Sequence, residues 1–446
     1  MASTYLSRAT SSAGNQLKHT ISFWFKRSNI SSNQCMISAS GDNSHANKRL
    51  YIFFSSGDFL YVKQYNGSGT DYELITNRTF RDTNAWYHCV IQYDAVNSTA
   101  NNRQRIWING VEETSFSART NPSTSTNSYL GGNGLNVYVG QDTNVSSRFF
   151  DGSISHLHYC DGYTYTASDF GSFDNDTGEW SINTSPSVSY GTTGFLILKD
   201  GNTITDQSSN SNDFSLGGGT LTKTEDNPSN VFATGNPLMV KLGTWSNGNN
   251  SIVGSSSSQV RPQMWSTLGA KSGKFYAEAK YTDTAGGMVG VSDYTGTMEM
   301  IRSGVYQGHA TNSVGFWQGG DKYVENNSVS WGNSWSNNDI IQIAMDLDNM
   351  CVYFGINGTW QESGDPTSGA SKTGGITIPN SRNEEYFMSW GDGSSGSSAT
   401  CHVNYGNGYF GTTAVSSAGT NASGIGIFEY DVPTGYTALS TKGLNQ

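Results

Sequence analysis

The stretch IAMDLDNMCVYFGINGTW (residues 343–360) decides the fold, because a closely similar pattern occurs earlier in the chain as WYHCVIQYDAVNSTANNRQRIWINGV (residues 86–111). In both copies the first run alternates apolar and polar residues, which is the period of a half-buried β-strand. Both second runs end in Asn-Gly, at Asn109-Gly110 and Asn357-Gly358. This dipeptide tolerates the positive φ angles of a two-residue hairpin turn, so each copy is predicted to be an antiparallel hairpin closed by a further hairpin.

The composition is typical of a β-rich globular chain with polar turns. The 446 residues are too many for one ordinary core, so two or more domains are expected. Aromatic residues make up 12% of the chain, which is too many for a disordered protein. The net charge is −11 and the basic residues do not cluster, so we expect no nucleic-acid partner and no attraction to anionic membranes.

The cysteines and the N-terminus indicate where the chain is made. Five cysteines lie singly in strand-like runs, which favours buried thiols in a reducing compartment: Cys35, Cys89, Cys160, Cys351 and Cys401. The first residues do not have the pattern of a signal peptide, and no run is long and apolar enough to insert into a membrane. We therefore expect a chain made in a host cytoplasm and displayed on a virus particle without secretion.

Two series of strand-like runs are separated by a looser region. The first series includes residues 19–26, 49–54, 59–62, 137–140 and 152–159, and the second includes residues 273–280, 288–291, 313–317, 386–390 and a tail at 428–433. Almost no helix is expected, apart from a turn near residues 166–170. The predicted fold class is all-β, with two antiparallel sandwiches at residues 1–165 and 241–446 and a partly β connector at 166–240.

Both sandwiches resemble known domain types. TISFWFKRS (20–28), WYHCVIQYD (86–94), RIWINGV (105–111) and FFDGSISHLHYCDG (149–162) resemble the laminin-G-like, or concanavalin A-like lectin, domain, a jelly roll. SGKFYAE (272–278), GVSD (290–293), WGNSW (331–335), DIIQIAMD (339–346) and YFGING (353–358) resemble the SPRY domain, a sandwich with different connections. The first resemblance covers about residues 4–169.

The connector also resembles a known segment, and the first sandwich departs from the laminin-G-like pattern at one point. TASDFGSFDNDTGEW, SYGTTGFLILKD and DNPSNVFATGNPL resemble a segment that joins these two domain types in virion structural proteins of bacteriophages of marine bacteria, including cyanobacteria. Laminin-G-like domains usually begin with a strand and a D-x-S segment ahead of the portion that starts here at Tyr5. Residues 195–214 have that appearance, so we hypothesise that they complete the first sandwich.

We find no sequence pattern that predicts catalysis. Glycan cleavage needs two carboxylates across one strand surface, and the acidic stretches at 174–179 and 384–385 have the character of solvated loops. His156 and His158 could bind a metal with Asp151 or Asp161, although an ordinary strand pair is the more common explanation. The resemblance to laminin-G-like domains implies calcium as a possible cofactor, because such domains often hold it with loop carboxylates. The available carboxylates are Asp142, Asp151 and Asp161, and turn formation is the favoured explanation for all three.

Aromatic residues beside polar loops are the predicted ligand-binding residues. Tyr294, Trp317, Tyr323 and Trp360 border glycine-rich or polar loops, where SPRY domains contact their partners, although packing under a loop explains each about as well. Five other tryptophans fall in strand motifs and are interpreted as core: Trp24, Trp86, Trp107, Trp331 and Trp335.

The resemblances imply a non-enzymatic bacteriophage virion surface protein. We expect a tail fibre or spike that binds a host-surface glycan or protein during adsorption, with other virion proteins as partners and a homo-oligomer, such as a trimer, as its state. The alternative is a head decoration or capsid fibre protein attached to the major capsid shell. The sequence contains no heptads, β-helix repeats or collagen-like triplets for a shaft, which favours a short or globular appendage.

Overall fold

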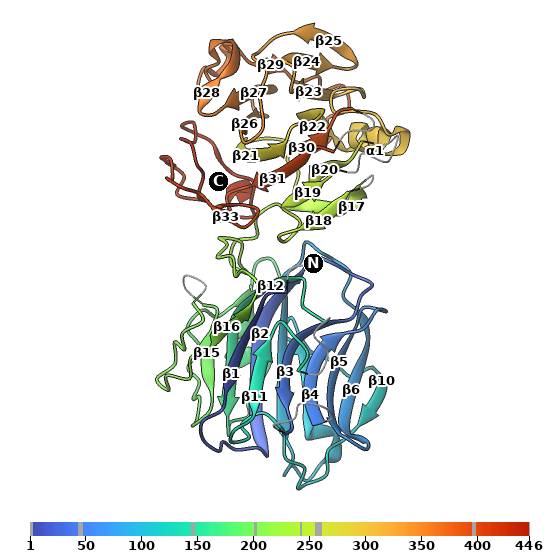
Figure 1. The fold of residues 1–446 in the computed structure, drawn as a ribbon, viewed down its shortest axis with the longest axis vertical. Helices are drawn as coiled ribbons and strands as arrows, with labels where there is room; N and C mark the ends of the chain where they lie inside the picture. The colour runs from blue at the N-terminus through green and yellow to red at the C-terminus, as the bar shows by residue number, and fades with distance from the viewer. Residues whose placement is uncertain are drawn as a thin grey trace. The chain divides into compact units, whose positions relative to one another are not determined.

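The protein consists of two compact β units, Met1–Lys223 and Thr224–Gln446. The fold is a computed structural model (Figure 1) and describes residues 3–42, 48–143, 148–199, 203–240, 243–254, 261–394 and 398–445. Antiparallel sheets make up both units, as the alternating sequence pattern predicts. No helix in the described part of the chain is long and apolar enough to cross a membrane.

The first unit stacks an eight-stranded sheet on a six-stranded sheet. In spatial order the larger sheet contains β10 (Phe116–Thr120), β6 (Thr70–Thr79), β5 (Phe59–Asn66), β4 (Lys48–Phe54), β3 (Gln34–Ser40), β11 (Asn136–Val139), β1 (Tyr5–Ala9) and β16 (Ser215–Gly218). The smaller contains β15 (Phe195–Ile197), β12 (Gly152–Asp161), β2 (Lys18–Arg27), β7 (Tyr87–Asp94), β8 (Gln104–Ile108) and β9 (Val111–Glu112).

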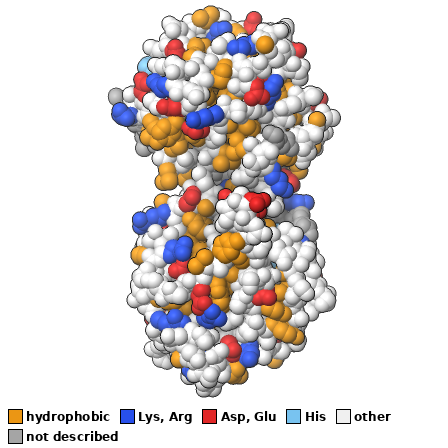
Figure 2. Space-filling model, turned by 180° about the vertical axis from the view of Figure 1, so that it is seen from behind, with side chains coloured by type: hydrophobic (Ala, Val, Ile, Leu, Met, Phe, Trp, Pro, Cys, Tyr) orange, Lys and Arg blue, Asp and Glu red, His pale blue; other side chains and the backbone are white. Residues whose placement is uncertain are grey.

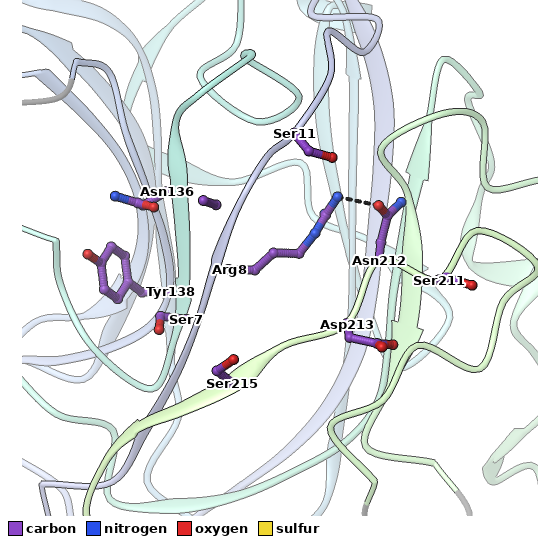
Figure 3. Close-up of a pocket in the computed structure, with 10 residues that line it drawn as sticks. Ser7, Arg8, Ser11, Asn136, Tyr138, Ser211, Asn212, Asp213 and Ser215 are labelled. Atoms are coloured by element: carbon purple, nitrogen blue, oxygen red, sulfur yellow. Dashed lines mark hydrogen bonds between the residues drawn. The ribbon is translucent and has the colours of Figure 1, made fainter.

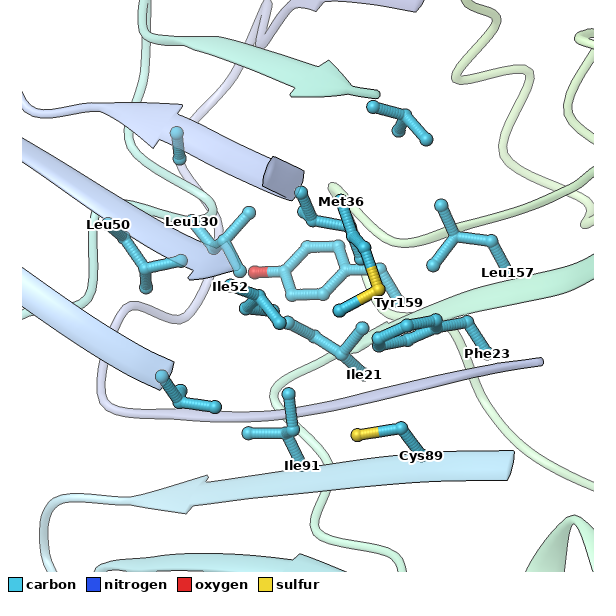
Figure 4. Close-up of a cluster of buried hydrophobic side chains, with 14 of the residues drawn as sticks. Ile21, Phe23, Met36, Leu50, Ile52, Cys89, Ile91, Leu130, Leu157 and Tyr159 are labelled. Carbon is cyan, nitrogen blue, oxygen red and sulfur yellow. The ribbon is translucent and has the colours of Figure 1, made fainter. Parts of the chain in front are cut away.

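The core of this unit lies between the two sheets, because one face of each strand is apolar. Figure 4 shows Phe23 and Ile91 of the smaller sheet packed with Met36 and Ile52 of the larger one. All four side chains are at most 2% exposed. Burying an aliphatic or aromatic side chain of this size stabilises a fold by about 1.5–3 kcal/mol, so this layer is a main source of the unit's stability.

The region predicted as a connector contributes strands to both sheets of the first unit. β15 pairs with β12, with Leu196 opposite His158, and β16 pairs with β1, with Ser215 opposite Ser7. Residues 195–218 thus supply an edge strand to each sheet, as the hypothesis about residues 195–214 requires. Residues 224–240 lie in the second unit, where β17 (Gly235–Val240) pairs with β20 (Gln263–Ser266).

The second unit contains a seven-stranded and a nine-stranded sheet. The first is β17 (Gly235–Val240), β20 (Gln263–Ser266), β30 (Tyr386–Asp392), β22 (Gly287–Asp293), β23 (Ser313–Trp317), β24 (Asp321–Val324) and β25 (Asn327–Ser330). The second is β18 (Thr244–Ser246), β19 (Ser251–Val253), β31 (Thr400–Asn404), β21 (Lys274–Asp283), β26 (Ile340–Asp346), β27 (Cys351–Ile356) and β28 (Thr359–Trp360), with β29 (Ile376–Thr377) on β27 and β34 (Thr437–Ala438) parallel to β21.

The two predicted hairpins are confirmed and have matching turns. β7 pairs with β8, and β26 pairs with β27. Asn109 and Asn357 have φ angles of 47° and 48° and are followed by glycines at 80° and 82°. Each asparagine side chain also accepts a hydrogen bond from the backbone N–H of the residue opposite, His88 at 2.7 Å and Ile340 at 2.9 Å.

Further short elements complete both units. β13 (Gly171–Phe173) pairs with β14 (Trp180–Ile182), and β32 (Tyr409–Phe410) pairs with β33 (Thr413–Ala414). The described 3₁₀ turns are Ala100–Asn102, Ala167–Asp169, Gln361–Ser363, Gly369–Ser371 and Gly443–Asn445. The second of these confirms the turn predicted near residues 166–170.

The expectation of almost no helix missed one α-helix, α1 (Tyr294–Ser303). Asp293 caps its N-terminus by accepting a hydrogen bond from the Gly296 N–H, and Gly304 ends it with a φ of 67°. The buried residues are Gly296, Thr297 and Met300, of which only Met300 is apolar. The sequence of α1 therefore shows no hydrophobic periodicity, although its buried residues are spaced as on one face of a helix.

The expectation of a strand at residues 428–433 was wrong. Phe428 and Val432 are buried, but this segment covers the outer face of β21, β26 and β27, where they pack with Tyr276 and Tyr353. Residues 165–190 contribute to a similar cluster in the first unit, where Phe170 packs with Val90 and Trp107. Each repeated hairpin is thus buried on both faces, because the chain after the last long strand folds back over it.

Candidate binding site

A polar pocket lies in the first unit, where β1 and β16 separate. The described pairing between these strands ends at Ser7 and Ser215, while β1 continues to Ala9 beside β11. The resulting cavity has a volume of about 480 Å³ and is lined by Ser7, Arg8, Ala9, Ser11, Asn136, Tyr138, Ser211, Asn212, Asp213 and Ser215. Figure 3 shows Arg8 reaching from β1 toward Asn212, with Asn136 and Tyr138 on the other side of β1.

The strands separate because residues 206–214 fold around the buried carboxylate of Asp206. Its Oδ1 atom accepts hydrogen bonds from the N–H groups of Leu196 and Ser208, both at 2.9 Å. Its Oδ2 atom accepts hydrogen bonds from the N–H of Asn212 and the hydroxyl of Ser208, both at 2.8 Å. Phe214 then enters the core, where its ring centroid lies 4.8 Å from that of Phe195. Asp206 is therefore a positioning residue for one wall of the pocket.

Arg8 connects the two walls. Its side chain is on the core-facing side of β1 and only 8% exposed, and it donates hydrogen bonds to the Thr193 carbonyl at 3.0 Å and to Oδ1 of Asn212. Its guanidinium also lies 5.9 Å from the centre of the Phe195 ring. Burial lowers the pKa of Arg8, and the carboxylates of Asp206 and Asp213 oppose this change. The cation is thus held by its neighbours and directed inward.

The remaining lining is mostly small and polar. Four serine hydroxyls and the amide of Asn136 line the cavity, and Tyr138 contributes the only aromatic ring among the lining residues. The Tyr138 ring lies 6.0 Å from the ring of Tyr5, and burial raises the pKa of its phenol. Asp213 is exposed and contributes a carboxylate to the lining. Such a lining can donate and accept hydrogen bonds on several sides of one small ligand.

The four aromatic residues predicted to bind a ligand do not form one site. Tyr294 is the first residue of α1 and is 49% exposed, and Trp317 and Tyr323 lie on the neighbouring strands β23 and β24. Tyr323 packs against Tyr306, with ring centroids 5.1 Å apart. Trp360 is in the other sheet, half-buried against Tyr276. Their role in binding stays a prediction.

The tryptophans interpreted as core are buried, with one exception. Trp24, Trp86, Trp107 and Trp335 are all less than 9% exposed, and Trp331 is half-buried against the core of the second unit.

Two of the three predicted calcium ligands, Asp142 and Asp161, have other partners in the structure. Asp142 forms ion pairs with Arg49 at 3.6 Å and Arg148 at 3.2 Å. Asp161 accepts hydrogen bonds from the N–H groups of Asn15 and Thr193. Among the described residues no three acidic, histidine or cysteine side chains are grouped to hold a metal ion. This arrangement does not fit a calcium site built from the three aspartates.

The two histidines considered as metal ligands, His156 and His158, have different surroundings in β12. A β-bulge interrupts β12 between Ser155 and His158, and His156 has a φ of 49° there. The imidazole of His158 is 2% exposed and shares a 2.9 Å hydrogen bond with the Tyr190 hydroxyl. Burial lowers the pKa of His158 well below its usual value. His158 therefore helps to hold residues 165–190 on the sheet.

The sequence interpretation did not single out the residues that line the pocket. Arg8 lies in a short strand, and residues 206–214 were recognised only as a segment that completes the sandwich. An arginine two positions after an apolar residue, as Arg8 is after Leu6, is a usable signal when the segment is a strand, because both side chains then face the core and buried arginines require partners. Its partners, Thr193 and Asn212, are about two hundred positions away, so local pattern could not identify them.

Comparisons with known proteins agree with the β-sandwich fold. Residues 2–169 match the family model described as the concanavalin A-like lectin/glucanases superfamily. No curated protein sequence matches this chain. Solved structures with similarity include the SPRY domain of human HERC1, which is 16% identical with a TM-score of 0.29 and covers 38% of this chain and 96% of its own.

Two further solved structures show similarity of the same order. A human SPRY domain is 15% identical with a TM-score of 0.26, covering 37% of this chain and 94% of its own. A heptameric SAP-like pentraxin from Limulus polyphemus is 13% identical with a TM-score of 0.30, covering 44% of this chain and 89% of its own. The family model matches residues 2–169, and the sheets of both units make the described part of the chain almost entirely β.

Proposed function

We propose that this protein is a non-enzymatic binding protein on the surface of a bacteriophage particle, of the tail fibre or spike type, which contacts a host-surface glycan or protein during adsorption. The observation that carries the binding role is the pocket around Arg8, whose walls present hydroxyl, amide and carboxylate groups beside one aromatic ring. The phage context is supported by the resemblance of the connector segments.

The surface chemistry supports adhesion to uncharged polar ligands. On the face that Figure 2 shows, basic side chains are scattered among acidic ones, and most of the remaining surface is uncharged. Binding to phosphate-rich surfaces depends on gathered lysine and arginine, since each neutralised phosphate adds electrostatic attraction. Hydroxyl and amide groups, together with the exposed hydrophobic side chains that the same face shows, are therefore the available contacts.

The test is an adsorption assay with the full-length protein. Purified protein is added to host cells before phage, and bound protein and surviving infection are measured over a range of concentrations. Saturable binding that blocks infection is the expected result. Saturable binding without any block, or no binding at all, would contradict the proposed role in adsorption.

One observation favours the alternative of a head decoration or capsid fibre protein. The described strands all belong to the two compact units, and none of them forms an extended shaft. A decoration protein would be present in many copies on each particle and would bind isolated capsids. Quantification of copies per particle, together with binding to empty heads, separates the two placements and also tests for the expected homo-oligomer, such as a trimer.

A further inference from the structure

We propose that the cavity beside β1 binds an extended peptide segment of a partner protein. The peptide pairs with the open edge of β1 and places a lysine or arginine beside Asp213. This inference rests on the proposed function, because it names the partner class of the same site. It is carried by an interrupted strand pairing, by the backbone groups that the interruption leaves open, and by the local charge.

The pairing between β1 and β16 stops where the cavity begins. Ser7 lies opposite Ser215, so a continued antiparallel pairing would place Ala9 opposite Asp213. It does not continue, because Phe214 turns into the core. The described pairing therefore ends at Ser7, while β1 runs on to Ala9 along β11. This leaves a gap in the sheet beside Ala9.

The backbone of Ala9 points into this gap. Neighbouring residues of a strand direct their N–H and C=O groups to opposite sides. Both groups of Thr10 are bonded on the β11 side, its N–H to the Leu135 carbonyl at 2.9 Å and its carbonyl to the Gly134 N–H at 2.7 Å. The N–H and C=O of Ala9 therefore face the other way, where the described register provides no strand to bond them.

An extended peptide backbone has the groups that this gap lacks. Open strand edges accept an added strand, because each peptide unit offers one N–H and one C=O at the spacing of the ladder. The volume of about 480 Å³ is within the range of small-ligand sites, so it admits a short segment. Ser7, Ala9, Ser11 and Ser215 line it with small side chains, which leave room for a peptide backbone.

The gap lies within the sheet, so side chains of both faces border it. Leu6 and Arg8 point to the core, whereas Ser7 and Tyr138 lie opposite each other on the outer face. Arg8 fills the core side of the gap. A long side chain of the bound peptide therefore has room only on the exposed side.

The charge at the cavity favours a basic residue there. Among the described lining residues Arg8 is the only cation, and its guanidinium is bonded to Thr193 and Asn212. Two carboxylates, Asp206 and Asp213, lie close enough to oppose the fall in its pKa, so the local charge is negative. Asp213 is exposed, and Figure 3 shows it across the cavity from β1. Its Oδ1 accepts a hydrogen bond from the Asp206 N–H at 2.8 Å, which leaves Oδ2 for a lysine or arginine of the peptide.

The test measures peptide binding to the full-length protein by calorimetry and ligand-observed NMR. The probes are the acetylated, amidated peptide Thr-Val-Lys-Val-Thr, the same peptide with Glu in place of Lys, and the Lys peptide N-methylated at every residue. We expect the Lys peptide to bind with a dissociation constant between roughly 0.1 and 1 mM. The Glu peptide should bind at least about ten-fold more weakly, and the methylated peptide should not bind, because it cannot donate to a strand.

Hydrogen exchange locates the contact on β1. A saturating concentration of the Lys peptide should slow exchange of the Ala9 amide at least about five-fold, because its N–H becomes hydrogen-bonded. Exchange of the Thr10 amide should change little, since that N–H is already bonded to the Leu135 carbonyl.

Variants test the two contacts separately. Ala9→Pro removes the N–H that faces the gap without removing a bond to β11, and should weaken binding about five-fold. Asp213→Asn keeps an acceptor for the Asp206 N–H but removes the charge, so binding of the Lys peptide should weaken about three-fold. The matched control is Asp82→Asn, because Asp82 is an exposed aspartate of the same unit that also accepts one backbone N–H, from Asn84.

The outcomes separate this inference from the proposed function. No peptide binding, equal binding of the Lys and Glu peptides, retained binding of the methylated peptide, or unchanged exchange at Ala9 would overturn the inference. If the protein still blocks infection in those cases, the proposed function survives without this site. If the peptides behave as expected but the Ala9→Pro and Asp213→Asn proteins adsorb normally, the site is correct and the proposed use of it in adsorption is wrong.

Discussion

Trp180 donates its indole N–H to Nδ1 of His88 over 3.0 Å, and this bond joins residues 165–190 to the six-stranded sheet. The His88 ring is also nearly parallel to two indoles, those of Trp24 and Trp180, with ring centroids 4.8 Å and 5.9 Å away. Because Nδ1 accepts a hydrogen bond, Nε2 carries the proton and donates to the Ser22 hydroxyl at 2.8 Å. The covering segment therefore depends on a neutral histidine.

The first prediction concerns the stability of the first unit in acid. Burial lowers the pKa of His88 from 6.5 to about 3. Below pH 6.5 the unfolded chain binds a proton that the folded chain does not, so the free energy of unfolding falls as the pH decreases toward about 3. His88→Gln should make this dependence shallower by about 1.4 kcal/mol per pH unit. Urea unfolding at a series of pH values measures the slope.

A second variant separates the hydrogen bond from the protonation. Trp180→Phe keeps an aromatic ring on His88 but removes the donor, so it should lower stability by about 1 kcal/mol at neutral pH. Its slope between pH 6.5 and 3 should match that of the unchanged protein. If His88→Gln leaves the slope intact, His88 is not buried as a neutral group.

The second prediction concerns Glu278, which holds the C-terminal segment in the second unit. Its carboxylate accepts hydrogen bonds from the Tyr276 hydroxyl and from the N–H groups of Glu429 and Tyr430, at 2.8–2.9 Å. Burial raises its pKa from 4.5 to about 7, although these hydrogen bonds oppose the rise. Since the folded state favours the protonated acid, its contribution is complete below pH 4.5 and is lost as the pH rises through 7.

Hydrogen exchange at the amides of Glu429 and Tyr430 measures this effect. After correction for intrinsic exchange rates, protection should decrease from pH 4.5 to 7. Glu278→Gln should abolish this trend, because the glutamine side chain does not ionise. The glutamine N–H₂ group faces one of the two backbone N–H donors and cannot accept its hydrogen bond, so protection should be lower at every pH. A retained trend in Glu278→Gln would assign the pH dependence to another group.

The third prediction concerns the buried ion pair of Arg27 and Asp58. Their side chains are 0% exposed and 2.9 Å apart, and Arg27 also lies 4.3 Å from the Phe54 ring centre. Burial alone would raise the pKa of Asp58, but hydrogen bonds from Ser31, Arg81 and Arg27 lower it. Asp58→Asn leaves the guanidinium without its counter-charge and should cost about 3–5 kcal/mol.

Asn is a suitable replacement because position 58 has a φ of 64°, which asparagine adopts readily. Equilibrium unfolding measures the loss, and Glu112→Gln serves as the control, because Glu112 pairs with Arg105 in a partly exposed position. The control should cost about 1 kcal/mol or less. Equal losses in the two variants would show that burial of the pair is unimportant.

The fourth prediction concerns the repeated Asn-Gly turns. Asn109→Ala and Asn357→Ala each remove a residue suited to positive φ and a side-chain acceptor for a backbone N–H. Each change should destabilise its own unit by about 1–3 kcal/mol. Asn383→Ala is the matched control, because Asn383 has a φ of 55° in an exposed turn. Thermal unfolding should show larger losses for the two hairpin variants than for the control.

Local pattern was sufficient for the strands and their turns. The alternation in residues 86–94 and 343–346 identified β7 and β26, because one face of each strand is apolar and neighbouring side chains point to opposite faces. The Asn-Gly pairs identified the hairpins, because few residues adopt positive φ without strain. Local pattern failed at α1, whose buried face is built from Gly296, Thr297 and Met300, and at Phe428, whose apolar side chain covers a sheet instead of belonging to one.

The sequence by itself thus determined that the chain is all-β, where most strands lie and which turns join them, since these follow from side-chain periodicity and backbone preferences over a few residues. Only the tertiary structure decided which sheet edges β15 and β16 occupy in the first unit. The same is true of the hydrogen bond from Trp180 to His88 and of the one from Arg8 to Asn212. These contacts join residues up to about two hundred positions apart. They depend on which strand edges and buried polar groups find partners when the whole core forms, and no local pattern encodes that choice.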